Sequence, residues 1–281
     1  MRLSFSTASL YHLPLGFSLG LARDLGFDGV ELVVGPEYLL RGERYVRRLI
    51  EDSGVRALSL HPPMRPFGLP VPGWPRREAA NIPKTVAAAR SFGSEVVVIH
   101  ASAARREGNC AWHAYAQAMR AALEMPGPPL TVAVEISQHT KRAYRTAMDD
   151  IDTMLHFVED QGAEVGITLD TAHTGANGDD LLALYTRLRP RIRNIHLSDW
   201  AVRKGNHRTH LVPGEGHLPL AEFLSTLARD GYTGLLTLEV SPIHLHAWSL
   251  GQARKRLAAS LAAVRADLQL PRPESSALAG R

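Results

Sequence analysis

The sequence has little cysteine and no long apolar run, and each absence excludes a class of protein. One cysteine, Cys110, among 281 residues excludes an intramolecular disulfide framework and any zinc site built from cysteines. No run approaches the roughly 18 uninterrupted apolar residues of a membrane span, so we expect no membrane partner. No glycine-rich dinucleotide fingerprint follows the first predicted strand, which disfavours an open nucleotide-binding sheet.

The remaining composition fits one large globular domain. Hydrophobic residues make up 45% and charged residues 21% of the chain, which excludes a mostly disordered or collagen-like protein. The formal net charge of +4 comes from scattered residues, so it permits an anionic substrate and disfavours nucleic acid as a partner without excluding it. The apolar stretch 3–22 is interrupted by His12 and Pro14, unlike a secretion signal, so we expect a cytoplasmic protein.

A short β-rich run followed by a helical stretch occurs eight times along the chain. The predicted strands are Arg2–Thr7, Gly29–Val34, Arg56–His61, Glu95–His100, Leu130–Ile136, Val165–Asp170, Ile192–Ser198 and Leu235–Val240. The predicted helices are Leu15–Leu25, Glu43–Ser53, Arg76–Phe92, Trp112–Glu124, Asp149–Gln161, Asp179–Arg189, Pro219–Asp230 and Ala247–Leu268. This α/β alternation predicts a single (β/α)8 TIM barrel over residues 1–270, followed by a disordered tail, 271–281.

The alternation of side chains along the predicted strands separates two faces. Counting back by two from the strand ends gives a mostly small or polar set, which we expect inside the barrel: Ala57, Ser59, Thr131, Ala133, Gly166, Thr168, Leu235 and Thr237. The opposite parity gives a large aliphatic set, which we expect against the helices: Leu58, Leu60, Val132, Val134, Ile167, Leu169, Leu236 and Leu238.

Seven of the eight predicted strands end with a residue that can bind a metal or transfer a proton. They are Glu31, His61, His100, Glu135, Asp170, His196 and Glu239. Asp, Glu and His make up about one residue in seven of the chain, so chance is a poor explanation for seven such strand ends. The carboxyl ends of barrel strands converge, so these side chains should meet in one pocket.

Several carboxylates at close range repel one another unless a cation neutralises them. Three carboxylates and one imidazole suit Mn²⁺, Mg²⁺, Co²⁺ or Zn²⁺, and we expect such a divalent metal as the cofactor. Four of the strand-end residues supply this set: Glu135, Asp170, His196 and Glu239. His173 follows Asp170 by three residues and should face the same pocket, as a ligand, a substrate hydrogen-bond donor or a partner of a ligand.

Eight short segments, in order along nearly the whole chain, carry a resemblance to a known family. They are Gly26-Phe-Asp-Gly-Val-Glu-Leu, Leu60-His-Pro-Pro, Val98-Ile-His, Val134-Glu-Ile, Leu169-Asp-Thr-Ala-His, Ile195-His-Leu-Ser-Asp, Pro213-Gly-Glu-Gly and Gly231-Tyr-Thr-Gly-Leu-Leu-Thr-Leu-Glu. Together they resemble the xylose-isomerase-like barrel superfamily. That group contains sugar isomerases and epimerases, inosose dehydratase-type enzymes and endonuclease IV-type enzymes that cleave abasic-site DNA (AP endonuclease family 2).

For the sugar epimerases, the resemblance implies that Glu135, Asp170, His196 and Glu239 hold the metal. Glu135 and Glu239 would be catalytic and would move the proton at the carbon next to the substrate carbonyl. His173 would orient a substrate oxygen. We therefore expect a divalent-metal-dependent isomerase or epimerase of a sugar or sugar phosphate, with a small-molecule sugar substrate, and we leave open whether it forms a homo-oligomer.

For the endonucleases, the resemblance implies three zinc ions that share these ligands. The first would be held by His61, His100 and Glu135, the second by the four-residue set above, and the third with help from His173 and His210.

Arg208 stands where the endonucleases have an aspartate. A cation cannot ligate zinc, so Arg208 suits a phosphate or carboxylate of a substrate instead. His61 and His100 fit sugar hydroxyls as well as a second metal, and Glu31 either lines the pocket or pairs with an arginine. Hydrolysis of abasic-site DNA, dehydration of a polyol or keto-sugar, and a non-catalytic barrel that binds sugar or metal are the alternative functions.

Overall fold

The computed structural model describes residues 1–64, 74–75, 77–139 and 145–270. The tail 271–281 lies outside these residues, so its disorder stays a prediction. In the described part of the chain, no helix is both long enough and apolar enough to span a membrane.

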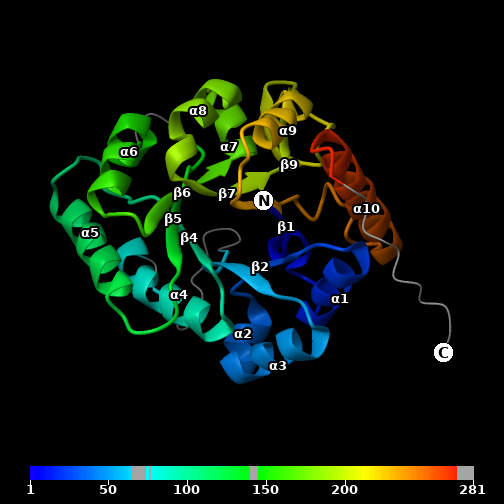
Figure 1. The fold of residues 1–281 in the computed structure, drawn as a ribbon, viewed down its shortest axis with the longest axis horizontal. Coiled ribbons are helices and arrows are strands. Elements are labelled where there is room, and N and C mark those ends of the chain that lie inside the picture. The colour runs from blue at the N-terminus through cyan, green and yellow to red at the C-terminus, as the bar shows by residue number, and fades with distance from the viewer. Residues whose placement is uncertain (65–73, 76, 140–144, 271–281) are drawn as a thin grey trace.

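Eight parallel strands close into a barrel that the helices surround (Figure 1). The strands are β1 (Arg2–Ser6), β2 (Gly29–Val33), β3 (Ala57–His61), β4 (Val96–His100), β5 (Thr131–Glu135), β6 (Val165–Asp170), β7 (Ile192–Leu197) and β10 (Leu235–Leu238). Each strand is hydrogen-bonded to its neighbours along the chain, and β10 closes the circle by pairing with both β7 and β1. The prediction of a single (β/α)8 TIM barrel is confirmed.

The helices of the described residues include a counterpart for every predicted one. They are α1 (Leu15–Leu25), α2 (Pro36–Arg41), α3 (Glu43–Ser53), α4 (Glu78–Phe92), α5 (Cys110–Leu123), α6 (Ile151–Asp160), α7 (Thr171–Asn177), α8 (Leu181–Leu188), α9 (Leu220–Arg229) and α10 (Leu250–Asp267). The two short helices α2 and α7 were not predicted. Side chains of Asn109, Asp150, Asp180 and Ser249 accept hydrogen bonds from the first turns of α5, α6, α8 and α10, which explains where these helices begin.

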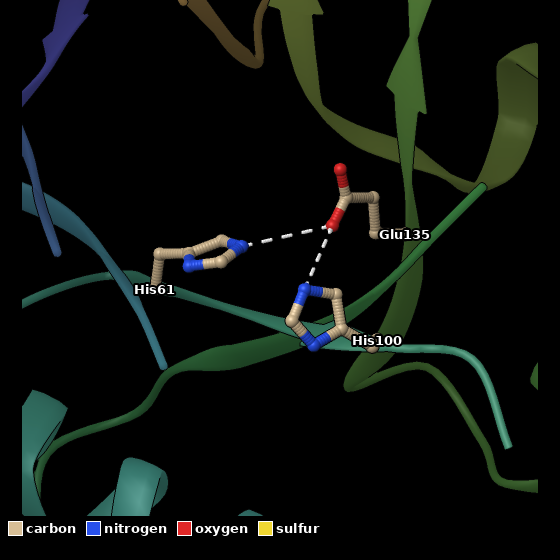
Figure 2. Close-up of side chains that lie close together, drawn as sticks. All are labelled: His61, His100 and Glu135. Carbon is tan, nitrogen blue, oxygen red and sulfur yellow. Dashed lines mark ion pairs between the residues drawn. The ribbon is translucent and has the colours of Figure 1, made fainter. Parts of the chain in front are cut away.

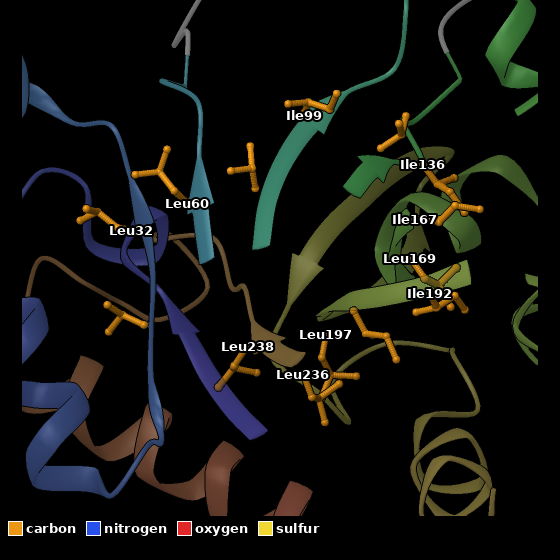
Figure 3. Close-up of a cluster of buried hydrophobic side chains, with 14 of the residues drawn as sticks. Leu32, Leu60, Ile99, Ile136, Ile167, Leu169, Ile192, Leu197, Leu236 and Leu238 are labelled. Carbon is orange, nitrogen blue, oxygen red and sulfur yellow. The ribbon is translucent and has the colours of Figure 1, made fainter. Parts of the chain in front are cut away.

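The main hydrophobic core lies between the outside of the barrel and the helices. Figure 3 shows aliphatic side chains pointing outward from the strands, including Leu60, Ile167, Leu169, Leu236 and Leu238. A second, small cluster contains Leu58, Val96, Ala133 and Leu235 and is separate from that outer core. Polar residues such as Ser59, Thr168 and Thr237 are fully buried outside both clusters, as the predicted strand parity requires.

The predicted parity is wrong at the start of β3. Leu58 is the extra residue of a bulge in the pairing with β2, so it joins the small cluster while Ala57 joins the outer core. A Cβ atom on Gly29 would lie 2.6 Å from the Leu58 side chain. Glycine at this position of β2 therefore leaves the space that the displaced leucine fills.

A two-stranded antiparallel hairpin after β7 is the main feature that the sequence pattern did not predict. Its strands are β8 (Asp199–Arg203) and β9 (Asn206–Leu211). The two residues between them, Lys204 and Gly205, have φ angles of 51° and 75°, as in the tight turns that match strand twist. The hairpin follows directly after His196 on β7 and so lies at the carboxyl end of the barrel.

Candidate functional site

The structure brings all seven predicted strand-end residues together in one connected cluster. Most of them are fully or almost fully buried: Glu31, Asp170 and His196 have no exposed surface, and Glu135 and His61 are 4% and 5% exposed. His196 on β7 contacts four carboxylates of this cluster, so it lies at the centre.

The inner group consists of His196 and three carboxylates from β5, β6 and the end of β10. The Nδ1 atom of His196 lies 2.9 Å from Glu239 Oε2, 3.3 Å from Glu135 Oε1 and 3.9 Å from Asp170 Oδ2. One ligand atom from each of the four residues falls within 4.8 Å of the others. These are the four residues that the sequence predicted as a metal set.

Glu31 fixes the orientation of the His196 ring. Its carboxylate lies 3.1 Å from His196 Nε2 and also accepts hydrogen bonds from Ser59 Oγ at 2.9 Å and Asn194 Nδ2 at 3.2 Å. The Nε2–H group therefore donates to Glu31, and Nδ1 faces the other three carboxylates. Glu31 thus contacts His196 rather than an arginine.

The outer group consists of His61, His100 and Glu135, which also belongs to the inner group (Figure 2). The Nε2 atoms of both histidines lie 3.7 Å from Glu135 Oε2. His61 Nδ1 lies 2.6 Å from the Pro62 carbonyl oxygen, to which it donates, so its Nε2 atom faces the cluster. The His100 side chain is 39% exposed, so the outer group opens toward solvent.

A third group joins Asp170 to His173 and His210. Asp170 Oδ1 accepts the backbone N–H of His173 at 2.8 Å, which caps α7, and His173 Nδ1 donates to the Ile136 carbonyl oxygen at 3.0 Å. The rings of His173 and His210 lie 5.2 Å apart, edge to face. His210 lies on β9 with a left-handed φ of 52°, so the hairpin delivers it to the site.

Burial alone would lower the pKa values of His196 and His61, but the surrounding carboxylates outweigh it. Facing Glu31 and Glu239, the pKa of His196 lies well above its usual range, and the pKa of His61 beside Glu135 rises to about 9. Burial would raise the pKa of Glu239, yet His196 brings it down to about 2. Protons on histidines therefore balance the carboxylates of the metal-free chain, and a cation would have to displace them.

Comparison with known families agrees with this geometry. The model of the xylose isomerase-like TIM barrel family matches residues 19–266. The chain belongs to this family. It is 30% identical over 297 aligned residues to the uncharacterized protein Rv0498 of Mycobacterium tuberculosis, covering 95% of this chain and 98% of that protein.

Two solved structures share the fold of this chain. The 3-keto-D-glucoside 4-epimerase YcjR from E. coli matches with a TM-score of 0.67 and 17% identity, over 93% of this chain and 99% of that one. The IolI protein, solved with a bound zinc atom, matches with a TM-score of 0.69 and 18% identity, over 95% and 99% of the two chains.

Within this xylose isomerase-like barrel, Arg208 does not join the third group. Its Nη2 donates to His244 Nε2 at 3.3 Å, and His244 Nδ1 donates to the His210 carbonyl oxygen at 3.0 Å. Burial and the nearby Arg208 charge lower the pKa of His244, which keeps the ring neutral. Sequence reasoning missed His244, because it lies in the loop after β10 and ends no strand.

Asp199 is a second residue that sequence reasoning missed. Its carboxylate accepts the backbone N–H groups of Trp200, Gly214, Gly216 and Leu218 at 2.8–3.1 Å. A Cβ atom on Gly216 would lie 2.3 Å from Asp199 Oδ1, so only glycine fits there. Asp199 joins two of the segments that carry the family resemblance, His-Leu-Ser-Asp and Pro-Gly-Glu-Gly. The presence of both segments was the one sign in the sequence that Asp199 has a role.

Proposed function

We propose that this chain is a divalent-metal-dependent isomerase or epimerase of a sugar or sugar phosphate. The observation that carries the proposal is the convergence of Glu135, Asp170 and Glu239 on His196 Nδ1. An epimerase is among the proteins of similar structure, which supports this class of reaction. At 17% identity, the likeness itself shows only that the two chains share a fold.

The residues present fit a divalent metal. Asp170 Oδ2 is buried and has no hydrogen-bond partner, and it is directed at the same cluster as His196 Nδ1. Such a set of acceptors is costly to bury unless a cation satisfies it. Oxygen-rich coordination with one imidazole suits Mn²⁺, Mg²⁺, Co²⁺ or Zn²⁺, and zinc is bound in the IolI structure.

The metal, when bound, would polarise the carbonyl and neighbouring hydroxyl of a sugar. Glu135 and Glu239 flank that position from β5 and β10. One carboxylate takes the proton from the carbon beside the carbonyl, and the C–H electron pair moves toward the carbonyl oxygen. The other, entering as the acid, returns a proton to the opposite face, which inverts the carbon. If the proton returns instead to the former carbonyl carbon, the former carbonyl oxygen keeps a proton as a hydroxyl, and the hydroxyl on the first carbon loses its proton to become the new carbonyl, which gives the isomer.

We propose that three histidines hold substrate hydroxyls. His173, His61 and His100 each have one ring nitrogen facing the cluster or its open side. Hydrogen bonds to the Pro62 and Ile136 carbonyl oxygens fix the rings of His61 and His173, so these two can direct a donor or acceptor with little further loss of conformational freedom. This arrangement would orient the sugar relative to the two glutamates.

The test is a screen of ketoses and sugar phosphates in D₂O with the metal-loaded protein. Proton transfer at the carbon beside the carbonyl incorporates solvent deuterium, which NMR detects together with the new stereoisomer. Loss of water without such a product would indicate the dehydratase alternative. Absence of exchange, isomer and dehydration products across the screen would contradict the proposal.

Abasic-site endonuclease activity is the second candidate, because the described residues contain three ligand groups rather than one. Arg208 argues against it, since its guanidinium donates to His244 beside the third group and adds positive charge there. A duplex oligonucleotide with one abasic site, treated with the Zn²⁺- or Mn²⁺-loaded protein, tests this. Cleavage that a Glu239→Ala variant lacks would replace the isomerase proposal.

A further inference from the structure

The β8–β9 hairpin carries positive charge that no carboxylate of the described residues neutralises. Arg203, Lys204 and Arg208 lie on it, and none has an acidic group within the 4.0 Å of an ion pair in the described part of the chain. Elsewhere, arginines such as Arg189 and Arg254 pair with aspartates. The hairpin is therefore a cationic element at the rim of the candidate site.

Strand register places two of these arginines on one face. Ala201 pairs with Arg208 and Arg203 pairs with Asn206, and paired residues of antiparallel strands share a face. Ala201 is 1% exposed, so this is the face turned toward the protein. The opposite face carries His207, whose ring contacts Trp200.

Arg208 is held in place by a neutral partner. A guanidinium can only donate, so His244 Nε2 must be the acceptor, and His244 Nδ1–H donates to the His210 carbonyl oxygen. Glu215, whose charge acts on His244, is paired with Arg256 of α10. Four of the five N–H donors of Arg208 therefore have no hydrogen-bond acceptor among the described residues. The hydrogen bonds from Arg208 through His244 lead to His210, whose ring contacts the His173 ring.

We infer that Arg208, with Arg203 beside it, binds a phosphate group of the substrate at the rim of the site. The inference rests on the proposed function and narrows its substrate class to phosphorylated sugars. A planar guanidinium with free donors binds phosphate oxygens in pairs, and partial burial strengthens each charged hydrogen bond. The hairpin would thus select the substrate's charged end, away from the carbon at which the glutamates act.

Three ketohexoses that differ only at carbon 6 test this inference: D-fructose, D-fructose 6-phosphate and D-fructuronate. Calorimetric titration of the metal-loaded protein should show that fructose 6-phosphate binds best and that Arg208→Ala weakens it about tenfold or more. Arg203→Ala should have a smaller effect. Arg48→Ala, which removes an exposed arginine of α3, is the matched control and should change none of the three affinities.

The outcomes separate this inference from the proposed function. If fructose 6-phosphate binds no better than fructose, or if Arg208→Ala and Arg48→Ala have equal effects, the phosphate site is wrong. A preference for fructuronate that depends on Arg208 would also overturn it, in favour of a carboxylate site. Arg208-dependent phosphate binding without turnover of any ketose would support the phosphate site while contradicting the isomerase proposal.

Discussion

The inner and outer ligand groups share Glu135 but differ in how they are built. The inner group around His196 is buried, and its central histidine is oriented by Glu31 and faces carboxylates at 2.9–3.9 Å. In the outer group, His61 and His100 lie 3.7 Å from Glu135, and His100 is partly exposed. Burial and a fixed ring favour a tightly held metal, whereas an open and looser group favours an exchangeable substrate.

The difference between the two groups shows that residue type alone does not determine whether a group of side chains binds a metal or a substrate. Both groups combine imidazole with carboxylate at strand ends, and the sequence left His61 and His100 open as sugar-hydroxyl contacts or ligands of a second metal. In the inner group, three carboxylates converge on His196 Nδ1, and Asp170 Oδ2 is buried without a hydrogen-bond partner, which is an arrangement that a cation satisfies. We therefore expect substitutions in the two groups to affect different quantities.

The largest expected effect comes from the carboxylates proposed to move the proton. Glu239→Gln and Glu135→Gln should each lower turnover about a thousandfold or more, because an amide cannot accept the proton. The fold should persist, since both side chains keep their size. Turnover is measured on the substrate found in D₂O, and circular dichroism checks folding. A near-normal rate in either variant would remove the two-glutamate mechanism.

The next largest effect is expected from Glu31, whose carboxylate orients the His196 ring of the inner group. Glu31→Gln should weaken metal binding about 10–100-fold, because the uncharged amide no longer holds the His196 N–H donor in place. Metal-chelator competition measures the affinity. Ser59→Ala is the matched control, since it removes another hydrogen bond to the same carboxylate but leaves His196 in contact. Equal effects of the two variants would show that Glu31 acts only through packing.

The third effect concerns pH and the outer group of the metal-free protein. The pKa of His61 is raised to about 9, so its contribution to stability is complete below pH 6.5 and is lost as the pH rises through 9. Chelator-treated protein should lose about 3 kcal/mol of unfolding free energy over this window. Urea titrations at several pH values measure it. His61→Asn should flatten the slope, and the exposed His113→Asn should not.

The strand ends were predictable because each lies in a local pattern. A β-rich run followed by a helical stretch fixes where a strand stops, and the barrel then brings distant ends such as Glu31 and Glu239 together. The exception at Leu58 was not predictable, because a bulge depends on packing across β2 rather than on the alternation within β3.

The contacts between loops could not be predicted from the sequence patterns. His244 reaches Arg208 only because the loop after β10 lies beside the β8–β9 hairpin. The hairpin itself was missed although Lys204 and Gly205 form its turn, since the expected pattern assigned this stretch to a βα loop. Such contacts arise from tertiary packing that no short-range periodicity encodes.

The smallest expected effect comes from His100, and it is the most direct test of the difference between the inner and outer groups. His100→Asn should raise KM about tenfold, the size of one lost hydrogen bond, because this partly exposed ring is placed to hold a sugar hydroxyl. The variant should keep the metal content of the unsubstituted chain, measured by elemental analysis after dialysis, since His100 is absent from the inner group. Loss of metal from this variant would mean that the outer group also holds an ion. The two groups would then be parts of one multi-metal centre. That result would favour the abasic-site endonuclease function over the isomerase or epimerase function.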